Sequence, residues 1–281
     1  MKGGDSFTHV TLMKLRNLLL TLSLLGLYFL FSSHELFLKM KKYQLAPQQQ
    51  AELFLFNGTF DTSENVITRD RIVEAHIWGP DYDRQPKASD YYDEGTATYL
   101  RFPTGEAGTY VAGISTVPRT IELDAEAFLS YLEHEELSSI IAAREEQGLS
   151  DQPAREEYAK HVKAIFQVGD QRSDHYGLVL GYPIEFIPLS NPYEGQVGQP
   201  MAFQLLYEGR PLAGQTVHYS VREPGAKQGP ERTLRTDARG RFTLSPDQPG
   251  QWYLATIHMT ERPEEDLDYE SQWATLTFAV Q

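Results

Sequence analysis

Cysteine is absent from this sequence of 281 residues. Its absence excludes disulfide bonds, zinc sites with thiolate ligands, iron–sulfur clusters, cysteine nucleophiles and lipid attachment at a lipobox cysteine. Any metal site in this protein would therefore have to use nitrogen and oxygen ligands.

Basic residues are scarce relative to acidic ones. Lys and Arg number 25 against 39 Asp and Glu, which gives a formal net charge of -14. The excess of acid repels phosphate backbones, so we expect no nucleic-acid partner, and cations are the more natural ligands. Motifs of catalysis are also lacking: the sequence has no nucleophile elbow, phosphate-binding glycine loop or metalloprotease helix. We expect a protein that is not an enzyme, with a copper oxidase built on an N-terminal histidine brace as the alternative.

The longest apolar run, residues 18–31 (LLLTLSLLGLYFLF), lies close to the amino terminus. Lys14 and Arg16 precede it and Ser33 follows it, which is the three-part plan of a secretory signal. The run is shorter than the roughly 20 residues of a membrane-spanning helix. We expect residues 1–33 to be a signal helix that is removed on export to the periplasm. An uncleaved N-terminal helix that anchors the protein is the alternative.

Residues 34–188 predict a first β-sandwich domain with a helical insertion. Short runs rich in aromatic and β-branched residues alternate with Gly, Pro, Asp and Asn, as is typical of sandwiches. Between about residues 124 and 166 the apolar residues recur at three- and four-residue steps, which favours helices. Gly148 can end one helix in the left-handed conformation, and residues 150–153 (SDQP) can begin the next.

Residues 189–281 predict a second, immunoglobulin-like sandwich. The segment 189–200 (LSNPYEGQVGQP) is polar and rich in turn residues, so it marks a domain boundary. About six strands follow at the regular spacing of a sandwich. Residues 236–242 (TDARGRF) have the Asp and Gly of a hairpin turn. The predicted fold class is mainly β, with two sandwich domains.

An ordered set of short motifs across the mature chain resembles a known family. The motifs are 34–38 (HELFL), 108–110 (GTY), 148–151 (GLSD), 157–160 (EYAK), 183–190 (PIEFIPLS), 236–242 (TDARGRF), 249–252 (PGQW), 258–259 (HM) and 273–278 (WATLTF). In this order they are similar to exported proteins with a domain of unknown function, DUF4198, that are usually described as NikM-like components of nickel and cobalt uptake. The resemblance implies transition-metal transport in the periplasm.

His34 is the first candidate metal ligand. Cleavage after Ser33 would make it the first residue, and its free amine and imidazole could then chelate one ion, which suits Cu(II) or Ni(II). Cleavage after Ser32 would leave one residue before it. Cleavage after Phe31 would give a third-position histidine, whose backbone amides could join a square-planar site. A purely structural role, as the start of the first strand, is the alternative.

Two further residues are candidate ligands. His258 lies in a predicted strand and within a family-like motif, and it could be packed in the core, exposed or a ligand that shares an ion with His34. Glu185 lies between apolar neighbours, where an unpaired carboxylate would be costly to bury, so a salt bridge or a metal should partner it. The salt bridge is the simpler partner.

These observations predict a periplasmic protein of an uptake system that binds Ni(II) or Co(II), with Cu(II) as competitor, or a small metal chelate. A membrane transporter is the expected partner. The affinity of the exported protein for metal should fall as the pH drops through the histidine range near 6.5, because binding needs a deprotonated imidazole and amine. The runner-up is a structural or adaptor β-sandwich module that contacts an envelope transporter and binds no metal.

Overall fold

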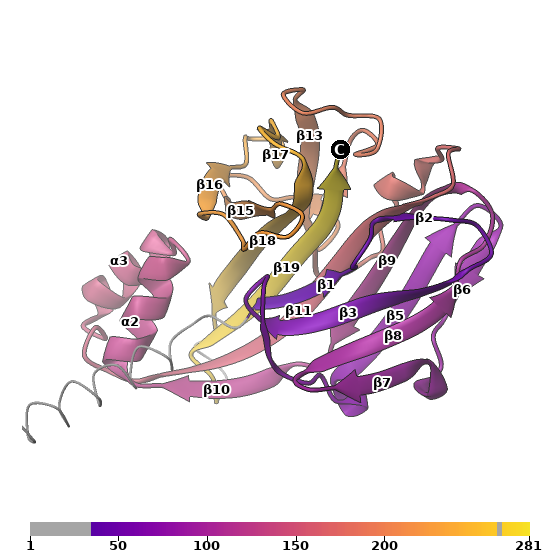
Figure 1. The fold of residues 1–281 in the computed structure, drawn as a ribbon. Coiled ribbons are helices and arrows are strands. Elements are labelled where there is room, and N and C mark those ends of the chain that lie inside the picture. Colours follow the sequence, from indigo (N-terminus) through magenta and orange to yellow (C-terminus); the bar gives the residue numbers. More distant parts are fainter. Residues whose placement is uncertain (1–34, 263–265) are drawn as a thin grey trace, which may run out of the picture. The chain divides into compact units, whose positions relative to one another are not determined.

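The computed structural model describes residues 35–262 and 266–281, and their strands form three sheets (Figure 1). The sequence prediction of a mainly β protein is confirmed. The five-stranded sheet contains β1 (Glu35–Lys39), β3 (Gln50–Gly58), β4 (Ser63–Asn65), β7 (Tyr91–Glu94) and β8 (Ala97–Pro103). The four-stranded sheet contains β12 (Ile184–Pro188), β13 (Met201–Tyr207), β14 (Arg210–Pro211) and β17 (Arg241–Leu244).

The third sheet has ten strands, and the other two sheets pack against it. Its strands are β2 (Gln44–Leu45), β5 (Ile72–Gly79), β6 (Tyr82–Arg84), β9 (Gly108–Thr116), β10 (Arg119–Leu123), β11 (Ala154–Val168), β15 (Thr216–Arg222), β16 (Arg232–Arg235), β18 (Gly250–Glu261) and β19 (Tyr269–Val280). None of the three sheets closes into a barrel. Short 3-10 helices occur at Arg69–Arg71, Ala88–Asp90 and Asp174–Gly177.

The two smaller sheets cover opposite faces of the ten-stranded sheet. Along β11, Val162, Ala164 and Phe166 belong to one apolar core, together with β1, β3 and β8. Ile165 belongs to a second core, together with β12, β13 and β17. Successive strand residues point to opposite faces of a sheet, so the two cores lie on either side of β11. Strand residues of the ten-stranded sheet are therefore buried on both faces.

The helical block is shorter than the sequence predicts. Two helices form, α2 (Ala125–His134) and α3 (Ser138–Gln147), and Gly148 ends α3 with φ 69°, as predicted. The predicted helix after residues 150–153 is wrong, because residues 154–168 form β11. The strand AREEYAKHVKAIFQV is buried along most of its length and has polar residues on both of its faces, so its sequence shows no two-residue alternation of apolar and polar residues. Parallel pairing with β19 and antiparallel pairing with β9 then outweigh the local helical preference.

The predicted hairpin at residues 236–242 is a turn between two sheets. Asp237 and Gly240 close the turn through a hydrogen bond of 2.9 Å from the Gly240 N–H to the Asp237 carbonyl. The strands on either side do not pair with each other: β16 pairs with β15 and β17 pairs with β13. A Cβ atom at position 240 would lie 2.8 Å from the carbonyl oxygen of Leu205, so the chain needs glycine where it crosses between sheets.

The ten-stranded sheet contains strands from both predicted domains. β11, from the first, pairs in parallel with β19, from the second, through nine residue positions. The division into residues 34–188 and 189–281 stays a prediction, as does the immunoglobulin-like character of each half. Expression of residues 190–281 alone would test it: a cooperative thermal transition would support the division, and its absence would contradict it.

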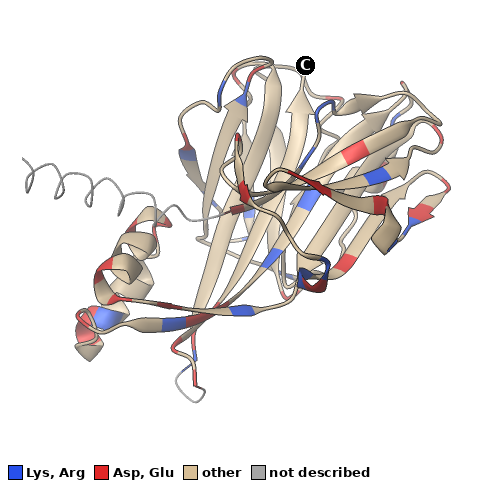
Figure 2. Ribbon diagram, turned by 60° about the horizontal axis from the view of Figure 1, so that its bottom comes forward, with Lys and Arg blue, Asp and Glu red and all other residues tan. Residues whose placement is uncertain are grey.

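Charged residues of both signs are spread over the described part of the chain. Figure 2 shows acidic and basic residues on the helices as well as along strands and loops. Within residues 35–262 and 266–281, no helix is both long enough and apolar enough to span a bilayer. The predicted signal helix, residues 1–33, and His34 lie outside the described residues.

Candidate functional site

The carboxyl end of α2 places three polar residues over the ten-stranded sheet. Phe128 and Leu132 of α2 are fully buried in a core formed with β18 and β19, which fixes the helix on the sheet. His134 ends the helix, and Glu135 and Glu136 follow it. The carboxyl end of a helix has a partial negative charge, which favours cations in this place.

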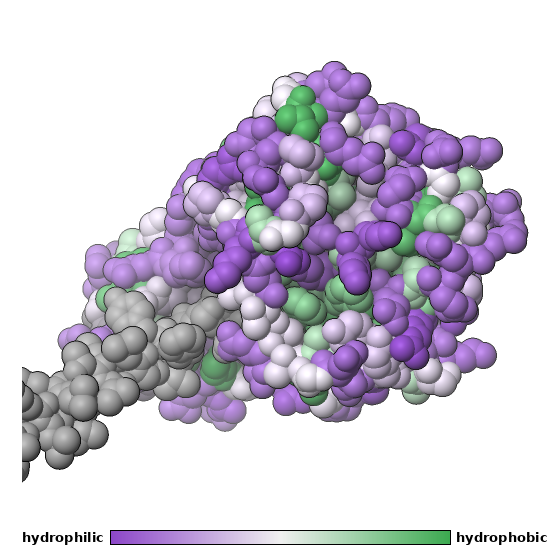
Figure 3. Space-filling view, in the orientation of Figure 1, coloured by the Kyte–Doolittle hydropathy of each residue, from purple (hydrophilic) through white to green (hydrophobic). Residues whose placement is uncertain are grey.

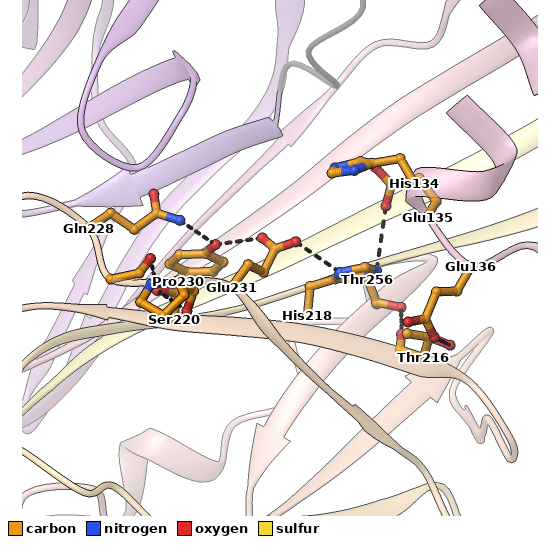
Figure 4. Close-up of polar contacts among 12 residues, drawn as sticks. His134, Glu135, Glu136, Thr216, His218, Ser220, Gln228, Pro230, Glu231 and Thr256 are labelled. Carbon is orange, nitrogen blue, oxygen red and sulfur yellow. Dashed lines mark hydrogen bonds and ion pairs between the residues drawn. The ribbon is translucent and has the colours of Figure 1, made fainter. Parts of the chain in front are cut away.

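His218 of β15 lies between two carboxylates beneath this helix end (Figure 4). Its Nδ1 is 3.1 Å from Oε1 of Glu231, and its Nε2 is 3.9 Å from Oε2 of Glu135. The His218 and Glu135 side chains are only 5% and 3% exposed. The ring of His134 stacks over that of His218, with 6.3 Å between the ring centroids. Two imidazoles and two carboxylates therefore meet here, with His218 and Glu135 buried and His134 exposed at the surface.

The Nε2 atom of His218 is the unsatisfied position of this group. It is buried and has no hydrogen-bond partner among the described residues. Burial lowers the pKa of His218, but the hydrogen bond to Glu231 and the charges of Glu135 and Glu231 outweigh burial, so its pKa is raised. The surroundings thus favour positive charge at this imidazole.

Glu231 is held in place from its other side. The hydroxyl of Tyr253, on β18, donates a hydrogen bond of 2.7 Å to Oε2 of Glu231. The side-chain amide of Gln228 donates to the same hydroxyl over 2.9 Å (Figure 4). Burial would raise the pKa of Glu231, yet the hydrogen bonds from His218 and Tyr253 outweigh it and lower the pKa. Glu231 is therefore a carboxylate in a fixed orientation.

The beginning of β1 lies near this group, because the ring of Phe37 packs against that of Tyr253 with 4.9 Å between the ring centroids. Burial raises the pKa of Glu35 well above the usual range, and the charges of Glu135 and Glu231 raise it further, while Lys160 opposes them. The strand is fixed here because the hydroxyls of Thr275 and Thr277, on β19, donate to the carbonyls of β1. We call His134, Glu135, His218, Glu231 and Glu35 the acidic cluster.

The acidic cluster has the chemistry to attract a cation. It combines imidazole nitrogens and carboxylate oxygens, the ligands that Ni(II), Co(II) and Cu(II) accept in a protein without cysteine. Within residues 35–262 and 266–281, however, no three His, Asp or Glu side chains are close enough together to hold a metal ion by themselves. A metal would need further ligands from outside this part of the chain.

Of the three ligands predicted from sequence, Glu185 has a complete set of partners. Lys163 lies 3.0 Å away, with both side chains buried. The backbone N–H groups of Leu180 and Gly181 donate to the two Glu185 oxygens, each over 2.9 Å. This is the salt bridge that the sequence analysis offers as the simpler partner for Glu185.

His258 lies on β18, on the face opposite to His218. In the antiparallel register, His218 pairs with Ala255, so Ala255 and Ile257 share its face and His258 does not. The His258 ring lies 4.4 Å from that of Tyr207, and its Nδ1 is 3.2 Å from the side-chain oxygen of Gln215. His34 lies outside the described residues, so the predicted site shared by His34 and His258 stays a prediction.

The sequence alone does not predict the acidic cluster, because its members lie far apart in the chain. No local motif distinguishes His134, His218, Glu135 or Glu231 from other polar residues. The available signal was alternation in β15, which puts His218 on a polar face with Thr216 and Ser220. Nothing local indicates that the end of α2 covers that face.

The comparison with known families agrees with the motif order. The model of the family described as "Domain of unknown function (DUF4198)" matches residues 31–260. No curated protein matches the chain. The family match spans most of the sequence, including the whole acidic cluster. The chain belongs to the DUF4198 family.

Proposed function

We propose that this protein is an exported, periplasmic component of an uptake system that binds a divalent transition-metal ion or a small chelate of one. Ni(II) or Co(II) is the expected ion, with Cu(II) as competitor. The observation that carries the proposal is His218, a buried imidazole between Glu135 and Glu231 whose Nε2 has no hydrogen-bond partner among the described residues. The role proposed is binding, without catalysis.

The proposed site joins the mature amino terminus to the acidic cluster. His34 directly precedes Glu35, whose pKa responds to the charges of Glu135 and Glu231. After cleavage at Ser33, His34 would contribute its amine and its imidazole. A tetragonal site then needs about two more donors, and His218 with one carboxylate could supply them. The proposal thus replaces His258 with His218 as the second imidazole.

Membership in the DUF4198 family supports the proposal only in general terms. The NikM-like character of the chain is part of the proposal and explains why nickel and cobalt come first among the ions. A transporter in the membrane would be the partner that takes over the ion. The excess of acidic residues over the chain would favour the approach of cations.

Calorimetric titration tests the proposal. Protein that begins at His34, verified by intact mass, is titrated with Ni(II), Co(II) and Cu(II), next to protein with one additional residue before His34. We expect one ion per chain, with weaker binding when the amine is blocked. His218→Asn should weaken binding, while His175→Asn, a change in the 3-10 helix Asp174–Gly177, should not. If none of the three ions binds, the proposal fails and the adaptor module without metal is favoured.

Location and processing have their own test. Intact-mass measurement of protein recovered from a periplasmic extract should give a chain that begins at His34 or Ser33. A species that keeps residues 18–31 and sediments with membranes would show an anchored protein, and the amine of His34 would then play no part.

A further inference from the structure

Two hollows in the described surface share a pair of adjacent lysines. The first, of about 530 Å³, is lined by Met40, Lys41, Lys42, Leu45, Phe54 and Arg101, among others, and we call it the β3–β8 hollow. The second, of about 570 Å³, also contains Lys41 and Lys42. Both volumes are in the range of sites for small organic molecules.

Lys41 and Lys42 are unusual in this acidic protein. Both are exposed, and neither forms an ion pair with any described residue. Arg101 is a third cation that lines the β3–β8 hollow, and Glu52, the carboxylate of its lining, is bound to Arg101 at 2.9 Å. The β3–β8 hollow therefore has an excess of positive charge, although the chain as a whole is strongly negative.

The second hollow has a smaller excess of positive charge. Its additional cation, Arg222, is 3.1 Å from the Asp61 carboxylate, and Glu223 also lines it. The net positive charge from the two lysines is therefore larger in the β3–β8 hollow.

Aromatic rings extend from the β3–β8 hollow across the outer face of the five-stranded sheet. Phe54 contacts Tyr99 edge to face at 5.0 Å, and Tyr99 stacks on Tyr92 at 4.9 Å. The guanidinium of Arg101 lies 4.0 Å from the centre of the Tyr92 ring. The three rings are half-buried. The face of the molecule drawn in Figure 3 has hydrophobic residues among hydrophilic ones. The hollow therefore joins an apolar, ring-bearing surface to free cations.

We propose that the β3–β8 hollow binds an organic anion that contains a ring. The ring would lie on Leu45 and Phe54, which are half-buried, where apolar contact and ring stacking favour it. Its acidic group would lie at Lys41 and Lys42, which act as mobile point charges and accept carboxylate, sulfonate or phosphate. This site is separate from the acidic cluster and takes a ligand of opposite charge.

The test uses two probes with almost the same rings. Anilinonaphthalene sulfonate is anionic and N-phenylnaphthylamine is neutral, and both fluoresce more strongly when bound in an apolar place. Titrations are done with EDTA present, so that the outcome is independent of metal binding. We expect one sulfonate probe per chain, with a Kd that rises with salt. The neutral probe should bind more weakly.

The variants separate charge from apolar contact. The double change Lys41→Glu and Lys42→Glu should raise the Kd of the sulfonate probe by about tenfold or more, because charge is reversed at both positions. Lys87→Glu, an exposed lysine outside the β3–β8 hollow, is the matched control and should leave the Kd unchanged. Phe54→Leu should weaken both probes. Circular dichroism confirms the fold of each variant.

Competition distinguishes the acidic groups. Naphthoate and naphthyl phosphate are added against the bound sulfonate probe, and the better competitor identifies carboxylate or phosphate as the preferred group. The proposal is overturned if the neutral probe binds as tightly as the sulfonate. It is also overturned if the double lysine variant binds like the unchanged protein, or if Lys87→Glu weakens binding equally.

Discussion

Two ionic centres lie on opposite faces of the ten-stranded sheet, and they differ in the kinds of charged group that they bring together. On the face of the four-stranded sheet, Lys163 donates to Glu185 at 3.0 Å and to the carbonyls of Leu178 and Phe186 at 3.1 and 3.0 Å. Its ammonium group has three donors, so this centre has one charge of each sign and no unused donor.

The acidic cluster on the other face is composed differently. The imidazole of His218 has two carboxylates around it, and Glu35 experiences their charges as well. The comparison indicates that the Lys163–Glu185 pair serves the structure. In the proposed function, the acidic cluster instead contributes ligands to a bound cation.

The largest expected effect tests the structural role of the first centre. Lys163→Met should lower the free energy of unfolding by about 3–5 kcal/mol, because the Glu185 carboxylate would remain buried without its cation. Chemical denaturation at neutral pH measures it. Adding Glu185→Gln to this variant should recover part of the loss, since the side-chain oxygen can still accept from Leu180 or Gly181. A loss below about 1 kcal/mol for Lys163→Met would contradict the assigned role.

The second prediction concerns pH on the acidic face. Burial raises the pKa of Glu156, beside the acidic cluster, to about 7, although hydrogen bonds from Ser271 and Tyr131 act to lower it. A carboxyl group with a raised pKa binds more protons in the folded state, so its contribution to stability is present at low pH and is lost as the pH rises from 4.5 to 7.

Glu156→Gln should remove that dependence. Between pH 4.5 and pH 7.5, the unchanged protein should lose about 3 kcal/mol more of its unfolding free energy than the variant. Denaturation at a series of pH values gives both curves. Parallel curves for the two proteins would show that Glu156 stays ionised in the fold and that burial does not raise its pKa.

The third prediction separates binding from folding at His218. His218→Asn should lower the affinity for Ni(II) or Cu(II) by about 10- to 100-fold. It should cost only about 1 kcal/mol of stability, because one hydrogen bond to Glu231 is lost. Calorimetry and thermal unfolding on the same samples give the two numbers. Equal affinities with and without His218 would remove the acidic cluster from the metal site.

The smallest effect is expected at His258, on the opposite face. His258→Ala should lower stability by about 1 kcal/mol, through loss of the contacts with Tyr207 and Gln215. The affinity of the His258→Ala variant for metal should equal that of the unchanged protein. If affinity falls as far as in His218→Asn, His34 and His258 share one site, as the motifs alone would suggest, and the assignment to His218 is wrong.

Much of the fold could be predicted from the sequence where the pattern is local. Gly148 ends a helix as expected, because the end of a helix depends on neighbouring residues. Residues 154–168 misled the prediction, since a strand buried on both faces loses its polar alternation. The two predicted halves of the chain are joined by the pairing of β11 with β19, whose paired residues lie more than a hundred positions apart.

The candidate site shows the same limit more strongly. The partner of Glu185 could be anticipated as a class, because a carboxylate between apolar residues needs a cation. That His218 would meet Glu135 could not be anticipated, because the contact depends on how α2 packs through Phe128 and Leu132. Sequence patterns describe faces of single elements, whereas this site arises between a helix end and two sheets.

The most direct test is anomalous diffraction from crystals of mature protein, beginning at His34, that were grown with Ni(II) or Cu(II). Data collected on both sides of the absorption edge of the metal locate the ion independently of any assumption about its ligands. We expect one anomalous peak, from one metal ion, at the acidic cluster. The ion should lie about 2.0–2.1 Å from an imidazole nitrogen of His218 and be bonded to His34. A peak beside His258, or no peak in crystals of correctly processed protein, would contradict it.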